Sequence, residues 1–496
     1  MNASVCRTWQ LLIAVTPLVI SSVAAAAEPG VGYTYLGKIR PRHAREIQSS
    51  DWSVGAETMD RDYTVYANWK KYLGPLGVKK ARIQAGWAKT EQEPGKYDWA
   101  WLDEIIPDMV DQGVEPWVCL CYGNPIYPGG GGTGLSGGLP SSPEALAAWD
   151  EFVAAFVDRY KEHVDEWEVW NEPRGGQKAV PQYTDLVVRT AEAIRQRQPK
   201  SRIIVAAGGA FDTKFVESLL DSLKAQGKLG LVNEVTYHPY ATNPDSVHDR
   251  VRQLRDAVAR YSTEITLRQG ENGAPSRRGS FGALANYDWT EERQAKWTLR
   301  RLLGDLGRDI PSSYFAICDM VYLVTSKGRD SDLRDASSQL QTKINYKGLL
   351  QVNPDKTVDH AKTAYRAVQH VTAMFDDSLK RIEDYTCEVT GGAQDSSFSV
   401  FGYQASGGKQ IVTIWRDSDP PGERPELEHV TLSIRHGGFA DPVLVDMLSG
   451  KVYEISKSLW TADGKVHTFK NVPVYDSVIL IADRIAIPAG LIGDPK

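Results

Sequence analysis

Short apolar segments alternate with longer amphipathic ones over residues 53–375, and this alternation limits the folds open to the chain. Eight segments have the length and apolar character of buried strands: Val54–Glu57, Ala81–Ala85, Val114–Cys121, Glu166–Trp170, Ile203–Ala207, Glu234–Tyr237, Ile265–Gln269 and Tyr314–Cys318. Eight others are predicted helices: Tyr63–Tyr72, Trp99–Gln112, Pro143–His163, Gln182–Gln196, Thr213–Gln226, Ser246–Tyr261, Thr290–Leu306 and His360–Phe375. This count is typical of a (β/α)₈ barrel, whereas a doubly wound open sheet gives no reason for eight units. We therefore predict an α/β fold with a TIM barrel over residues 51–377.

The pattern changes after Phe375. Short strand-like segments now follow one another, separated by Gly, Pro, Asn and Asp: Ser397–Tyr403, Gln410–Trp415, His429–Ile434, Pro442–Asp446, Lys451–Ile455, Val466–Phe469 and Ser477–Ala482. They predict a small all-β, sandwich-like C-terminal domain over residues 378–496. Residues 28–50 precede the barrel, and their segment Gly32–Gly37 is a candidate additional strand of this β-domain.

Residues 1–27 have the pattern of a secretory signal peptide. Arg7 is followed by the apolar run Leu11–Ile20, and small residues precede Glu28. The apolar run is short and contains Pro17, which favours cleavage over a membrane anchor. We expect a secreted or periplasmic protein with no membrane partner after cleavage.

Composition and spacing disfavour several other functions. The net charge of −6 disfavours nucleic-acid or anionic-membrane binding, which needs a basic surface. The nine His are scattered without metal-binding spacing, so we expect no metal. The Gly-rich run Pro128–Gly138 lacks the Gly-Lys-Ser/Thr ending of a phosphate loop. We predict that it is a long loop at the rim of the barrel, and we expect no cofactor.

Two glutamates follow predicted strand ends. Glu172 lies in Asn171-Glu172-Pro173 and Glu271 follows Gly270, and the carboxyl ends of barrel strands are where catalytic groups gather. Two such carboxylates can flank one glycosidic bond, about 5–5.5 Å apart in a retaining enzyme. A half-buried carboxyl near Trp rings is expected to have a raised pKa, which suits Glu172 as a general acid. Glu168, within the strand, is expected to be structural or to face outward.

These motifs resemble those of clan A of the glycoside hydrolases, which are retaining (β/α)₈ enzymes. Further similarity lies in residues 81–87, in Tyr237-His238-Pro239-Tyr240, and in the order of barrel and β-domain. The chain looks most like family 39, which includes β-xylosidases and α-L-iduronidase. The predicted eighth strand departs from the clan, because it ends in Cys318-Asp319-Met320 where clan members often place a Trp beneath the sugar.

The resemblance implies roles for individual residues. Glu172 would be the acid/base and Glu271 the nucleophile of a retaining hydrolase that acts on an oligo- or polysaccharide. The resemblance further implies that Asn171 binds the sugar 2-hydroxyl, Tyr240 orients Glu271, Arg82 keeps Glu271 ionised and His238 lines the same rim. Separately, the aromatic or amide side chains on predicted rim loops are candidate sugar contacts: Trp87, Tyr122, Asn124 and Tyr127.

Alternative functions stay open at the level of sequence. An endo-acting β-glycanase similar to family 5 would use the same pair of glutamates, and so would a transglycosylase. A non-catalytic carbohydrate-binding barrel would be expected to lack one of the two. Glu57, Asp60 and Arg61 follow the first strand and are candidates either for sugar contact or for a structural ion-pair cluster.

Overall fold

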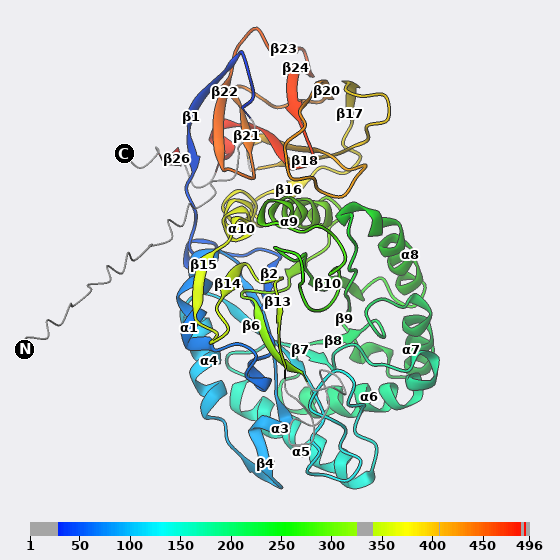
Figure 1. The fold of residues 1–496 in the computed structure, drawn as a ribbon. Helices are drawn as coiled ribbons and strands as arrows, with labels where there is room; N and C mark the ends of the chain where they lie inside the picture. The colour runs from blue at the N-terminus through cyan, green and yellow to red at the C-terminus, as the bar shows by residue number, and fades with distance from the viewer. Residues whose placement is uncertain (1–27, 325–340, 406, 488–490, 493–496) are drawn as a thin grey trace, which may run out of the picture.

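The computed structural model describes residues 28–324, 341–405, 407–487 and 491–492. The predicted signal peptide therefore lies outside the described residues. Figure 1 shows a barrel ringed by helices and, against one side of it, a separate body of β-strands. None of the described helices combines the length and apolar character needed to cross a membrane.

Eight parallel strands close the barrel, in the order β10-β11-β2-β3-β6-β7-β8-β9. Their bounds are β2 Trp52–Gly55, β3 Lys80–Gln84, β6 Glu115–Leu120, β7 Glu166–Val169, β8 Arg202–Ala206, β9 Glu234–Tyr237, β10 Thr266–Asn272 and β11 Ser312–Tyr314. The predicted barrel is confirmed. The last strand starts and ends earlier than predicted. Ile317 and Cys318 are buried although they lie beyond β11, so this part of the apolar run marks burial outside the barrel strand.

Helices surround the barrel, and the longer ones are amphipathic. Their bounds are α1 Tyr66–Trp69, α2 Leu73–Leu76, α3 Trp87–Thr90, α4 Ala100–Asp111, α5 Pro143–Tyr160, α6 Val180–Arg197, α7 Thr213–Ala225, α8 His248–Ala259, α9 Glu291–Leu306 and α10 Thr363–Met374. The first predicted helix, Tyr63–Tyr72, is shorter than expected, because α1 ends at Trp69 and a 3-10 turn over Lys70–Tyr72 leads into α2. The helix α5 begins where expected, since Ser142 Oγ accepts a hydrogen bond from the backbone N–H of Ala145 at 3.1 Å.

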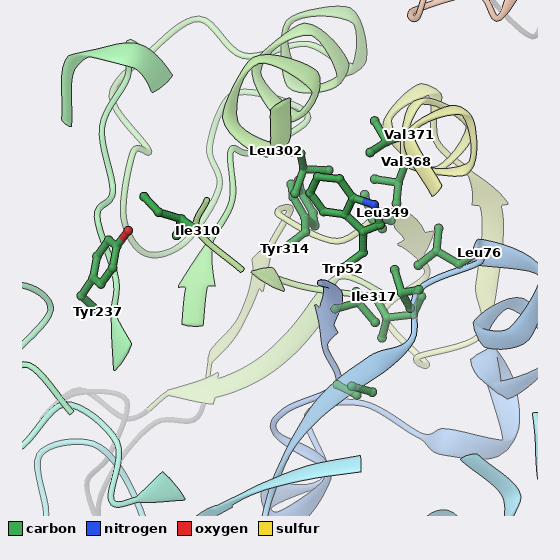
Figure 2. Packing of buried hydrophobic residues seen from close by; sticks show 14 of the residues in the cluster. Trp52, Leu76, Tyr237, Leu302, Ile310, Tyr314, Ile317, Leu349, Val368 and Val371 are labelled. Atoms are coloured by element: carbon green, nitrogen blue, oxygen red, sulfur yellow. The ribbon is translucent and has the colours of Figure 1, made fainter. Parts of the chain in front are cut away.

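Short strand pairs lie outside the barrel: β4 Glu91–Glu93 with β5 Lys96–Tyr97, β12 Met320–Val324 with β13 Gln341–Asn345, and β14 Leu350–Val352 with β15 Val358–Ala361. Figure 2 shows the core where β2 meets the last two long helices. Trp52 packs among Leu302 of α9 and Val368 and Val371 of α10, all at most 3% exposed. Burying side chains of this size contributes about 1.5–3 kcal/mol each.

The C-terminal residues form two antiparallel sheets, as the predicted sandwich requires. Their strands are β16 Lys380–Arg381, β17 Cys387–Gly391, β18 Phe398–Gln404, β19 Gln410–Arg416, β20 Glu428–Arg435, β21 Pro442–Asp446, β22 Lys451–Ile455, β23 Trp460–Asp463, β24 Val466–Val474, β25 Ile479–Asp483 and β26 Leu491–Ile492. The strand β1, Tyr33–Ile39, pairs antiparallel with β22 and so joins the larger sheet. In Figure 1, α9 and α10 lie between this β-domain and the barrel strands.

Candidate active site

Glu172 and Glu271 lie together at the carboxyl ends of the barrel strands. Glu172 follows β7 and Glu271 lies within the last residues of β10. One carboxylate oxygen of each, together with a ring nitrogen of His238, form a group whose atoms all lie within 4.8 Å of one another. The two side chains are 14% and 13% exposed, so both are largely withdrawn from water but open to a ligand.

Both glutamates line one cavity of about 290 Å³, here called the inner cavity. Its lining comprises Glu57, Thr58, Arg61, Gln84, Tyr122, Leu135, Asn171, Glu172, Arg174, Ala210, Tyr240, Glu271, Gly282, Ala283, Phe315, Tyr322, Asn345 and Lys347. A second cavity of about 630 Å³, the outer cavity, also borders Glu172. Its lining comprises Glu172, Pro173, Arg174, Gly175, Gly176, Gly208, Gly209, Ala210, Phe211, Asp212, His238, Pro239, Tyr240 and Arg250.

The backbone turns sharply where β7 delivers Glu172. Trp170 and Glu172 both adopt left-handed conformations, with φ of 66° and 46°. Non-glycine residues rarely adopt this region, and the surrounding structure must hold them there. The Trp170 ring is 3% exposed and packs against the rings of Tyr122 and Trp149. This anchored turn holds the Glu172 side chain at the junction of the two cavities.

Arg82 on β3 links the carboxylates of the site. Its Nη1 donates to Glu271 at 3.1 Å and to Glu57 at 3.0 Å. Its other face forms a bidentate pair with Glu168, both distances being 2.7 Å. Arg82 is fully buried, so its charge acts on Glu271 with little screening by water. Glu168 is also fully buried, which excludes the outward orientation considered from sequence.

Glu57 is a third carboxylate at this site. Gly55 makes room for it, since a Cβ there would lie 2.2 Å from Glu57 Oε2. Burial and the nearby negative charge of Glu271 outweigh the attraction of Arg82 and raise the pKa of Glu57 to about 7. The carboxyl of Glu57 therefore changes charge close to neutral pH.

Different partners hold the two rim glutamates. His238 Nδ1 lies 2.8 Å from Glu172 Oε1, and Tyr240 donates its hydroxyl proton to Glu271 Oε1 at 2.8 Å. Burial raises the pKa of Glu172, but the hydrogen bond and charge of His238 outweigh it, so the pKa lies below its usual value. For His238 burial lowers the pKa, but Glu271 and Glu172 raise it above its usual value. The raised pKa expected for Glu172 from the sequence is therefore wrong.

Asn171 also faces the site. Its Oδ1 accepts from Arg82 Nη2 at 2.9 Å, and its Nδ2 donates to the Tyr122 hydroxyl at 2.6 Å. These bonds hold its side chain in one orientation beside both glutamates. The structure therefore brings seven predicted residues together at this site: Arg82, Tyr122, Asn171, Glu172, His238, Tyr240 and Glu271.

Three predicted sugar contacts are wrong: Trp87, Asn124 and Tyr127. Tyr127 is buried and donates its hydroxyl proton to Glu91 at 2.6 Å. Trp87 is fully buried, where its ring stacks on Tyr127 and Phe152 and its Nε1 donates to Glu91 at 2.6 Å. Asn124 is fully buried as well, and its side chain donates to the backbone oxygen of Glu91 at 2.8 Å. These side chains fold the rim loops inward, so they support the rim instead of facing a ligand.

Several lining residues carry no recognisable motif in the sequence. Phe315 directly follows β11 and lines the inner cavity, so an aromatic ring does stand at the end of the eighth strand. It was missed because that strand was predicted to end later. Asn345 and Lys347 come from a distant segment that only the folded chain brings to the rim. Leu135 lies in the Gly-rich run, which places that loop at the cavity as predicted.

The barrel with its C-terminal β-domain has the architecture of several solved glycoside hydrolases. A family 39 glycoside hydrolase from the gut symbiont Bacteroides cellulosilyticus WH2 has a similar structure, with 16% identity and a TM-score of 0.60 over 90% of this chain and 83% of that one. A monomeric β-xylosidase from Caulobacter crescentus CB15 is similar over 90% and 97%, with 17% identity and a TM-score of 0.53.

A family 30 endoxylanase from Clostridium papyrosolvens C71 is similar over 91% of this chain and 98% of that one, with 12% identity and a TM-score of 0.54. No protein-family model and no curated protein matches the chain. The resemblance to clan A, with family 39 first among the similar structures, is confirmed for the fold.

Proposed function

We propose that this protein is a retaining glycoside hydrolase that cleaves O-glycosidic bonds in an oligo- or polysaccharide. The observation that carries the proposal is the close pair of carboxylates, with oxygens of Glu172 and Glu271 within 4.8 Å in one cavity. An inverting enzyme needs about 6.5–9.5 Å between its carboxyls to admit a water molecule. The spacing here favours direct attack by a carboxylate.

In the first step Glu271 attacks the anomeric carbon and forms an ester, while the bond to the leaving oxygen breaks. Glu172 gives its proton to that oxygen. Arg82 and Tyr240 hold one oxygen each of Glu271, which fixes the nucleophile in the inner cavity. Asn171 stands beside both groups and would bind a sugar hydroxyl there.

In the second step water attacks the anomeric carbon and the ester to Glu271 breaks. Glu172, now ionised, takes a proton from that water. His238 contacts Glu172 at 2.8 Å and lies 3.8 Å from Glu271. It can hold a proton beside Glu172 in the free enzyme. A bound sugar would exclude water and raise the proton affinity of the Glu172 carboxyl, so that the proton returns to it.

A screen of aryl glycosides tests the proposal with the wild type, Glu172→Gln and Glu271→Gln. We expect Glu271→Gln to lose turnover by orders of magnitude and to form no covalent adduct with an activated fluorosugar. Glu172→Gln should slow poor leaving groups far more than activated ones. An adduct on Glu271→Gln, or equal damage to both leaving-group classes in Glu172→Gln, would contradict the assignment.

We also propose that the protein is exported, because residues 1–27 have the pattern of a signal peptide. Expression with its own leader should yield a product in the periplasm or medium whose first residue is Glu28, as measured by intact-mass analysis. A full-length product retained with the cells would contradict export.

A further inference from the structure

The outer cavity lies next to the proposed acid and carries cationic side chains. If Glu172 protonates the leaving oxygen, as the proposed function requires, the leaving group departs past Glu172. Glu172 lines the outer cavity, whereas Glu271 does not. It is therefore placed to hold the leaving-group side of the substrate.

Two arginines line this cavity. Arg174 follows Glu172 by two residues, and Arg250 belongs to α8. Within the described part of the chain, neither arginine forms a salt bridge. Arg250 donates from Nη2 to the Phe211 backbone oxygen at 3.3 Å, and its guanidinium lies 4.4 Å from the centre of the Phe211 ring. These contacts hold the Arg250 charge at the cavity wall.

The carboxylates of the same lining already have partners. Asp212 Oδ1 accepts the backbone N–H of Phe215 at the start of α7, at 3.1 Å. Glu172 is hydrogen-bonded to His238. The arginine N–H groups thus remain to recognise a ligand, and guanidinium groups bind carboxylate and sulfate oxygens with favourable geometry. Phe211 also lines the cavity and adds apolar ring surface for a sugar to pack against.

We propose that the outer cavity binds a leaving group that bears an anion, so the substrate is an acidic saccharide with a carboxylate or sulfate on the sugar released past Glu172. Arg174 and Arg250 bind the anion, and Phe211 packs against the ring. Carboxylate and sulfate share this chemistry, and separate ligands distinguish them.

Calorimetric titration tests the site without relying on turnover. The ligands are a disaccharide containing glucuronic acid, its carboxyl-reduced neutral counterpart, and a sulfated disaccharide. We expect at least one acidic ligand to bind the wild type roughly five- to tenfold tighter than the neutral one, and the preference to shrink as salt rises. Arg174→Gln and Arg250→Gln should each reduce that preference. Arg252→Gln should leave it unchanged, because Arg252 lies on the same helix, is exposed, and pairs with Asp249.

A kinetic arm uses aryl glycosides whose leaving phenol carries a carboxylate or the matched carboxamide. The ratio of kcat/KM for the two should fall in both cavity variants, while Phe211→Ala should lower kcat/KM for both substrates. Equal affinity for acidic and neutral disaccharides in the folded wild type would overturn the inference. If acidic ligands bind but no glycoside is cleaved, the proposed function fails and the binding site stands.

Discussion

At the scale of single residues, one guanidinium organises most of the site. Arg82 donates to Glu57, Glu168, Asn171 and Glu271 from a fully buried position. Only an arginine has enough donors in a fixed fork to make these contacts at once. Glu57 shares the same Nη1 with Glu271, so the charge of one carboxylate affects the other.

Glu57→Gln tests this coupling through the pH dependence of kcat/KM. Because the pKa of Glu57 is raised to about 7, its negative charge is present only at neutral and alkaline pH. That charge favours retention of the proton that His238 holds for Glu172, and loss of this proton sets the alkaline limb. Removing the charge should therefore move the alkaline limb to lower pH by roughly half a unit to one unit. Glu115→Gln, an exposed change at the other end of the barrel, serves as control. An unmoved alkaline limb would refute the coupling.

At the scale of elements, site residues could be predicted from the sequence only where the end of a strand could be predicted. Glu172 and Glu271 were found because each lies at the end of a short apolar segment that polar residues or Pro and Gly bound clearly. The end of β11 was missed because buried residues continue past it through Ile317 and Cys318. Trp87 and Asn124 were misplaced because an aromatic or amide on a loop suits the core and a ligand equally well. Lys347 could not be found, since only tertiary packing brings it to the cavity.

A buried ion pair joins α9 to the β-domain. Lys296 Nζ and Asp476 Oδ1 lie 3.0 Å apart, and their side chains are 0% and 5% exposed. Lys296→Met should lower the free energy of unfolding by about 3–5 kcal/mol, because it leaves a buried carboxylate unpaired. The double variant Lys296→Met/Asp476→Leu should recover much of this loss in chemical denaturation.

The exposed pair Arg159–Asp103 is the matched comparison, with side chains 44% and 40% exposed. Asp103→Asn should cost less than about 1 kcal/mol. Similar losses in the free energy of unfolding at the two pairs would show that burial does not increase the cost of breaking the Lys296–Asp476 pair.

At the scale of the whole molecule, the β-domain is tied to the barrel from both ends of the described chain. The strand β1 precedes the barrel yet pairs with β22, so the larger sheet contains residues from before and after it. The composition of Gly32–Gly37 indicated such a strand, but its partner and register depend on contacts over hundreds of residues. The helix α10 then packs its buried face against this sheet's β21–β22 turn through His370.

His370 makes this junction sensitive to acid. Its Nδ1 donates to the Met447 backbone oxygen at 2.9 Å, and a Cβ on Gly450 would lie 2.4 Å from its Nε2. Burial lowers the pKa of His370 to about 4, from a usual value near 6.5. As the pH drops from 6.5 to 4, the unfolded chain binds a proton at His370 and the folded chain does not. This residue therefore lowers the free energy of unfolding by about 3 kcal/mol over that range.

We expect His370→Gln to remove that part of the pH dependence of the free energy of unfolding, measured by denaturant titration at each pH. Above pH 6.5 the variant should be less stable than the wild type, because glutamine fits the site less well. The difference should narrow between pH 6.5 and 4, since only the wild type then suffers protonation in the unfolded state. His163→Gln, at an exposed position, should show the same pH dependence of the free energy of unfolding as the wild type. A constant difference between wild type and His370→Gln across this range would show that the junction is not the acid-sensitive part of the molecule.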